Sequence, residues 1–89
     1  MVELTEQQMA DIRNFGALQY PIDKIISILE IQDPEEFKIE FNNEESAIFK
    51  KYRSGMDEAQ YKIDMRIFEL ARSGDMKAIQ MYNRKLKSN

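Results

Sequence analysis

The fold is decided by one stretch, Glu44–Leu86, which reads EESAIFKKYRSGMDEAQYKIDMRIFELARSGDMKAIQMYNRKL. Its first part places an apolar residue every three or four positions for roughly six turns, a spacing that keeps one face of an α-helix apolar. This first apolar stripe consists of Ile48, Tyr52, Met56, Ala59, Ile63, Ile67 and Leu70. The stretch therefore predicts one long helix, a tight turn at Ser73-Gly74-Asp75, and a shorter helix folded back.

A second apolar stripe, Tyr61, Met65 and Phe68, lies on the same predicted helix. At about 100° per residue, it is roughly 150° around the helix from the first stripe. The returning helix can cover the first stripe with Ile79, Tyr82 and Leu86. Leaving the second stripe exposed would create a larger apolar patch than soluble monomers usually carry. We therefore expect a homo-oligomer with an interface at Tyr61, Met65 and Phe68.

Gly55 leaves two interpretations of the long helix open. Ser54-Gly55 could end one helix, with Asp57 as the cap of the next. However, the apolar spacing passes through Gly55 without a shift, and one internal glycine costs only about 1 kcal/mol. We favour a continuous helix.

Two shorter helices are predicted near the N-terminus. Thr5-Glu6-Gln7-Gln8 has the form of a capping box, which predicts a first helix over 6–18. Pro21 suits the first position of a second helix, which ends near Glu30.

A third helix follows, with Asp33 as its cap and Pro34 at its first position. It runs to Phe41, and Asn42-Asn43 can cap the long helix. The second and third helices can be interpreted as a helix-turn-helix, with the third in the recognition position. The sequence thus predicts an all-α fold, a helix-turn-helix-like unit over 1–43 followed by a helical hairpin over 44–89, in one compact domain.

The composition excludes several classes of function. The chain has no cysteine and no histidine, so it lacks the commonest metal ligands and the commonest general base. No glycine-rich phosphate loop or nucleophile elbow is present, and we expect no catalytic residue, no metal and no cofactor. The acidic pairs Glu35/Glu36, Glu44/Glu45 and Asp57/Glu58 are explained by nearby predicted helix starts. No signal peptide or membrane span is indicated, so a cytoplasmic protein is expected.

Charge is divided unevenly along the chain. Residues 1–45 carry three basic and eleven acidic side chains, whereas residues 46–89 carry ten basic and five acidic ones. This asymmetry is typical of polyanion binding or of contact between copies, although solvated helix faces can differ in the same way. The candidate DNA contacts are Lys38, Lys50, Lys51 and Arg53, which would neutralise phosphates. Base reading is not indicated, because Glu35, Glu36 and Glu40 lie on the third helix.

The order of elements resembles the small terminase subunits of tailed phages and prophages. The resemblance begins with the predicted helix-turn-helix and continues through Phe49–Gly55 and Leu70–Tyr82. Within the latter, an Ala-x-x-Gly-Asp-x-x-Ala-x-x-x-Tyr pattern is matched by Ala71, Gly74, Asp75, Ala78 and Tyr82.

This resemblance implies a non-enzymatic component of viral DNA packaging, encoded by a phage or prophage. Such a protein binds double-stranded DNA, assembles into rings and regulates a large terminase subunit. The acidic third helix departs from a DNA-reading helix. The alternative is a small helical adaptor or regulator that binds only protein partners.

Overall fold

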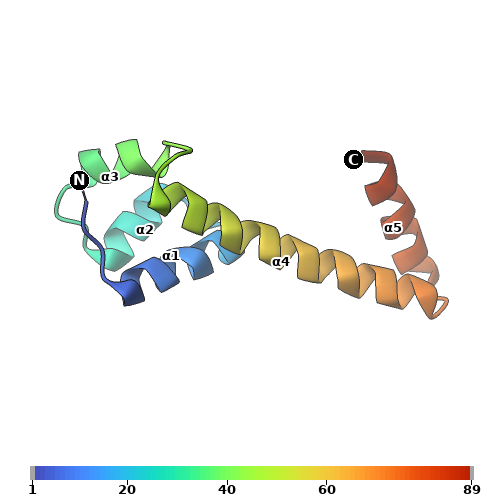
Figure 1. The fold of residues 1–89 in the computed structure, drawn as a ribbon. Coiled ribbons are helices and arrows are strands. Elements are labelled where there is room, and N and C mark those ends of the chain that lie inside the picture. Colours follow the sequence, from blue (N-terminus) through green and yellow to red (C-terminus); the bar gives the residue numbers. More distant parts are fainter. Residues whose placement is uncertain (1, 89) are drawn as a thin grey trace. The chain divides into compact units, whose positions relative to one another are not determined.

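The computed structural model describes residues 2–88, which form five helices and no strands (Figure 1). These are α1 (Glu6–Leu18), α2 (Ile22–Leu29), α3 (Pro34–Phe41), α4 (Ala47–Arg72) and α5 (Met76–Ser88). The predicted all-α class is confirmed, and α4 is continuous through Gly55 as expected.

Two compact units divide the chain within α4, one up to Glu58 and one from Ala59 onward. The sequence placed a boundary at residue 43, where the third helix ends. The first three turns of α4 instead belong to the N-terminal unit, since Ile48 and Tyr52 join its core. Each unit is described separately below.

Side-chain caps fix where the helices begin. The hydroxyl of Thr5 accepts a hydrogen bond from the Gln8 amide, and the Gln8 side chain accepts one from the Thr5 amide, which completes the predicted capping box. Asp33 accepts from the amide of Glu36 at the start of α3. The predicted cap of the long helix by Asn42-Asn43 is wrong. The cap is Ser46 instead, whose hydroxyl accepts a hydrogen bond from the Phe49 amide. The Asn43 side chain accepts from the Glu45 amide and so stabilises the turn before the helix.

Three helices end in the same hydrogen-bonded motif. After α1, α2 and α4 the chain enters a left-handed conformation at Gln19, Glu30 and Gly74, respectively. At the end of α4, the amide of Asp75 donates to Leu70 and that of Gly74 to Ala71, which is the Schellman pattern. Two of these positions hold residues other than glycine, a conformation costing about 1–2 kcal/mol each.

The core of the N-terminal unit is formed by Ile12, Ile25, Phe37 and Ile48, one from each of the four helices in it. Around them lie half-buried apolar side chains, including those of Phe15, Leu29 and Phe41. The hydroxyl of Tyr52 donates to the carbonyl of Tyr20 across 3.0 Å, and burial raises the pKa of this tyrosine. Helices α1 and α4 are therefore joined by both apolar and polar contacts.

Two buried glycines set the distance between α1 and α4. A Cβ atom on Gly16 would overlap the backbone carbonyl of Tyr52, and one on Gly55 would overlap the carbonyl of Arg13. Both obstacles are backbone atoms of the opposite helix, which cannot rotate away. The two helices thus cross with their backbones in contact, and Gly55 serves this contact rather than ending a helix.

We expect Gly55→Ala to destabilise the protein by about 1–3 kcal/mol, because the added methyl must push α1 from α4. In a helix without this contact, the same change would stabilise by about 1 kcal/mol, so the sign of the effect is the test. Urea unfolding followed by circular dichroism measures it. Asn14→Ala, at an exposed position of α1, is the matched control and should be nearly neutral. A Gly55→Ala protein as stable as the parent would contradict the close crossing.

Candidate nucleic-acid interface

The four predicted DNA contacts differ in how accessible their charges are. Lys38 lies 4.0 Å from Asp23 and 3.9 Å from Glu35, so its ammonium group is held among carboxylates. The guanidinium of Arg53 donates to Asp57 one turn further along α4. These exposed pairs are weak, about 0–1 kcal/mol each, but phosphate binding would have to displace them.

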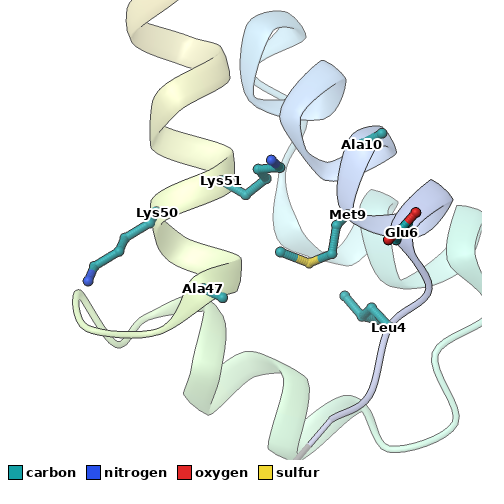
Figure 2. A pocket seen from close by; sticks show the side chains of 7 residues that line it. All are labelled: Leu4, Glu6, Met9, Ala10, Ala47, Lys50 and Lys51. Atoms are coloured by element: carbon teal, nitrogen blue, oxygen red, sulfur yellow. The ribbon is translucent and has the colours of Figure 1, made fainter.

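Lys50 and Lys51 lie beside a groove of about 580 Å³ between the starts of α1 and α4. Figure 2 shows Lys50 extending away from α1, and Lys51 lying between α4 and α1. Neither ammonium group is paired with a carboxylate in the part of the chain that the structure describes. The lining is mainly apolar and includes Leu4, Glu6, Met9, Ala10 and Ala47. Of the four predicted contacts, these two are therefore the available ones.

Helix α3 offers little for reading bases. Ile39, on its outer surface, is 70% exposed, and neighbouring Glu35 is exposed as well. Asn42 donates its side-chain amide to the carbonyl of Lys38 at 2.9 Å, which ties it to its own helix. An exposed isoleucine and a carboxylate suit a protein contact better than a contact with DNA.

In the C-terminal unit, α5 packs on α4 in a different phase from the one predicted. The ring of Phe68 packs at a tilt of 54° against that of Tyr82 with centroids 5.5 Å apart, and Lys85 pairs with Asp64 at 3.2 Å. The prediction that α5 leaves Phe68 uncovered is wrong. So is the prediction that it covers Ile63, which is 54% exposed.

The reason is that α5 lies over the strip of α4 between the two apolar stripes. About 100° per residue places Asp64 and Ala71 near the middle of this strip, with Ile67 on one side and Phe68 on the other. Ile67 and Phe68 are half-buried, and Ala78 of α5 is buried. Each apolar stripe is thus covered in part, and Tyr61 and Met65 remain exposed. The predicted interface at Tyr61, Met65 and Phe68 stays a prediction, and Phe68 now has a partner within the chain.

Every residue of the Ala-x-x-Gly-Asp-x-x-Ala-x-x-x-Tyr pattern has a structural position in this hairpin. Gly74 adopts the left-handed conformation with φ 98°, and Asp75 caps α5 by accepting from the Ala78 amide at 2.9 Å. Ala71 and Ala78 are half-buried and buried, respectively, and the Tyr82 ring packs at a tilt against Phe68. The pattern therefore specifies how α4 turns into α5.

Sequence reasoning missed a group of cations on α5. None of its four basic residues, Lys77, Arg84, Lys85 and Lys87, is among the predicted DNA contacts. Within residues 2–88, Lys85 alone of these four pairs with a carboxylate, while Lys77, Arg84 and Lys87 are exposed. Their spacing of seven and three residues on a helix without any acidic residue is the signal that could have found them.

The described residues contain no group of three or more acidic side chains placed to hold a metal ion. Burial raises the pKa of Tyr52, and this tyrosine lies in the core contact with Tyr20 rather than in a cleft. No helix over 2–88 is long and apolar enough to cross a membrane. Comparisons of the chain with protein-family models, curated proteins and solved structures find no match.

Asp75→Ala should destabilise the hairpin by about 1 kcal/mol, because the Ala78 amide loses its acceptor. Asp75→Ser should keep most of the stability, since a serine hydroxyl is an equally good cap. Thermal unfolding followed by circular dichroism distinguishes the two variants. If both are equally destabilised, Asp75 does not act as a cap.

Proposed function

We propose that the chain is a non-enzymatic, self-assembling DNA-binding component of viral or prophage DNA packaging, similar to a small terminase subunit. One observation carries the proposal. The five matching residues, Ala71, Gly74, Asp75, Ala78 and Tyr82, together build a hairpin at the end of a long helix. The residues that carry the resemblance thus each have a structural role in this chain. A large terminase subunit is the implied partner.

DNA binding in this proposal depends on phosphate contacts. The N-terminal unit carries six basic and thirteen acidic side chains, and its accessible cations at the groove are Lys50 and Lys51. With few contacts and no base-reading side chains on α3, binding is weak and indifferent to sequence.

Self-assembly in this proposal uses the apolar side chains that α5 leaves exposed. Tyr61 is 63% exposed, and Met65 and Ile63 are also accessible on α4. Burying such a side chain completely stabilises an interface by about 1.5–3 kcal/mol. The copies meet along the C-terminal half of α4.

One observation favours the alternative of a protein-binding adaptor. Leu18, Ile28 and Ile39 are exposed on the acidic N-terminal unit, where DNA phosphates would be repelled. A partner protein with an apolar, basic surface would fit them. DNA binding separates this alternative from the packaging function.

We expect the full chain to bind unrelated duplexes with similar affinity at about 50 mM salt, and binding to weaken steeply as salt rises. Lys50→Gln with Lys51→Gln should make the slope of log K against log salt shallower by about 0.9 for each lost contact. Fluorescence anisotropy measures both quantities. Absence of binding to every duplex at about 50 mM salt would favour the adaptor.

For assembly, we expect light scattering to show a homo-oligomer that Tyr61→Glu combined with Met65→Glu disrupts, because the two carboxylates would be buried in the interface. Leu18→Glu with Ile28→Glu adds the same charges at exposed positions of the other unit and is the matched control. A monomeric parent, or an oligomer that survives the Tyr61 and Met65 changes, would show that this surface is not the interface.

A further inference from the structure

We propose that the outer face of α5 binds the phosphates of duplex DNA, an inference that rests on the DNA-binding function above and assigns it to a second surface. We call this face the α5 basic stripe, and it consists of Lys77, Gln80, Asn83, Arg84 and Lys87. All five side chains are exposed. Most of the stripe lies on the side of α5 away from Ala78 and Tyr82, which contact α4 or are buried. Arg84 lies at its edge, where it lines a groove with Asp64 and Ile67 of α4.

Like Lys50 and Lys51 at the groove, the cations of the stripe form no ion pair within the described residues. Elsewhere in the described chain, Arg13 pairs with Glu58, Lys24 lies over the Tyr20 ring, and Arg66 is 4.0 Å from Glu69. Near α5, Asp64 of α4 is held by Lys85, and Asp75 caps the helix. No carboxylate pairs with Lys77, Arg84 or Lys87 within residues 2–88.

Helix stability does not explain the whole stripe. Lys87 lies in the last turn, where the helix dipole favours a cation. Lys77, in contrast, is the second residue of α5, where the dipole disfavours a positive charge. The Asp75 carboxylate caps this end of the helix, but the first turn itself contains no acidic residue beside Lys77. The helix dipole therefore does not explain why a cation lies at this position.

The length and chemistry of the stripe suit a nucleic acid backbone. Ten residues of helix from Lys77 to Lys87 span about 15 Å, and one DNA strand carries a phosphate roughly every 3.4 Å along the axis. The stripe can therefore lie along about four phosphates. Gln80 and Asn83 place amide donors between the cations, and such amides also bind phosphate oxygens.

Other partners fit less well. A membrane-surface helix needs one free apolar face, but the side of α5 with Ala78 and Tyr82 is used within the unit. The exposed apolar residues of α5, Met76, Met81 and Leu86, are five positions apart, which spreads them around the helix. Protein interfaces are depleted in lysine at their centres, and two of the three stripe cations are lysines. DNA is the partner that the composition favours.

The test compares two variants of the full chain, each with three cations replaced by glutamine. The stripe variant changes Lys77, Arg84 and Lys87, and the control changes Lys24, Arg66 and Arg72, which have partners within the chain. Both lose the same net charge. Anisotropy with two unrelated duplexes of about 30 base pairs measures affinity from about 50 to 200 mM salt, and circular dichroism verifies the helical content.

The stripe variant should lose about tenfold or more in affinity at about 50 mM salt, and its slope of log K against log salt should be shallower by about 2.7, or 0.9 for each contact. The control should change little in either quantity. Replacing Lys77 and Lys87 with arginine should preserve binding, because the charges remain.

Three outcomes would overturn the inference. If the parent binds and the stripe variant matches the control, DNA contacts another surface, and the proposed function stands without this site. If the parent binds no duplex, the proposed function and the inference fail together. If light scattering shows that the stripe variant loses assembly, a second copy occupies the stripe instead.

Discussion

The N-terminal unit depends on the contact between the backbones of α1 and α4 at Gly16 and Gly55. Two helices can approach this closely only where neither has a Cβ atom at the crossing. The short distance allows the Tyr52 hydroxyl to reach the Tyr20 carbonyl and Arg13 to reach both Ser54 and Glu58. It also brings Ile12 and Ile48 into one core with the shorter helices. The two glycines thus determine which side chains can meet, although they contribute no side-chain contact themselves.

Much of this unit could be predicted from the sequence because its signals are local. The cap of α1 requires only Thr5 and Gln8, and that of α3 requires only Asp33 and the amide of Glu36. The role of Gly55 was not predictable in the same way. The neighbouring residues indicate whether the helix continues through Gly55. They do not show why a glycine is needed, because a Cβ atom there would overlap the carbonyl of Arg13, which is distant in the sequence. The left-handed ends at Gln19 and Glu30 were missed for a related reason, since neither residue favours that conformation.

In the C-terminal unit, periodicity identified the apolar residues correctly but not the direction from which α5 covers them. Two apolar stripes on α4 offer α5 two faces to pack against. The prediction from the sequence was that α5 covers one stripe and leaves the other exposed. The helix instead packs between the stripes, where Ala71 and Ala78 permit close approach and Asp64 and Lys85 pair. The ion pair and the two alanines therefore determine which side of α4 faces α5. Neither feature is visible in the spacing of the large apolar residues. The consequence is that Ile63 on one side and Met65 on the other both remain accessible for contacts between copies.

Which basic side chains are available to bind phosphates also depends on their neighbours in the folded chain, and not on the sequence pattern alone. A charge count assigns Lys38 and Arg53 the same weight as Lys77 and Arg84. Within the described residues the first two pair with carboxylates, whereas the last two are exposed and form no ion pair. Binding to DNA gains free energy chiefly by releasing the counterions condensed on phosphates. A lysine already neutralised by an aspartate must first exchange one anion for another, which reduces its net gain. The basic character of the C-terminal half therefore matters through the cations that form no ion pair within the described residues, which are Lys50, Lys51 and the three of the α5 basic stripe.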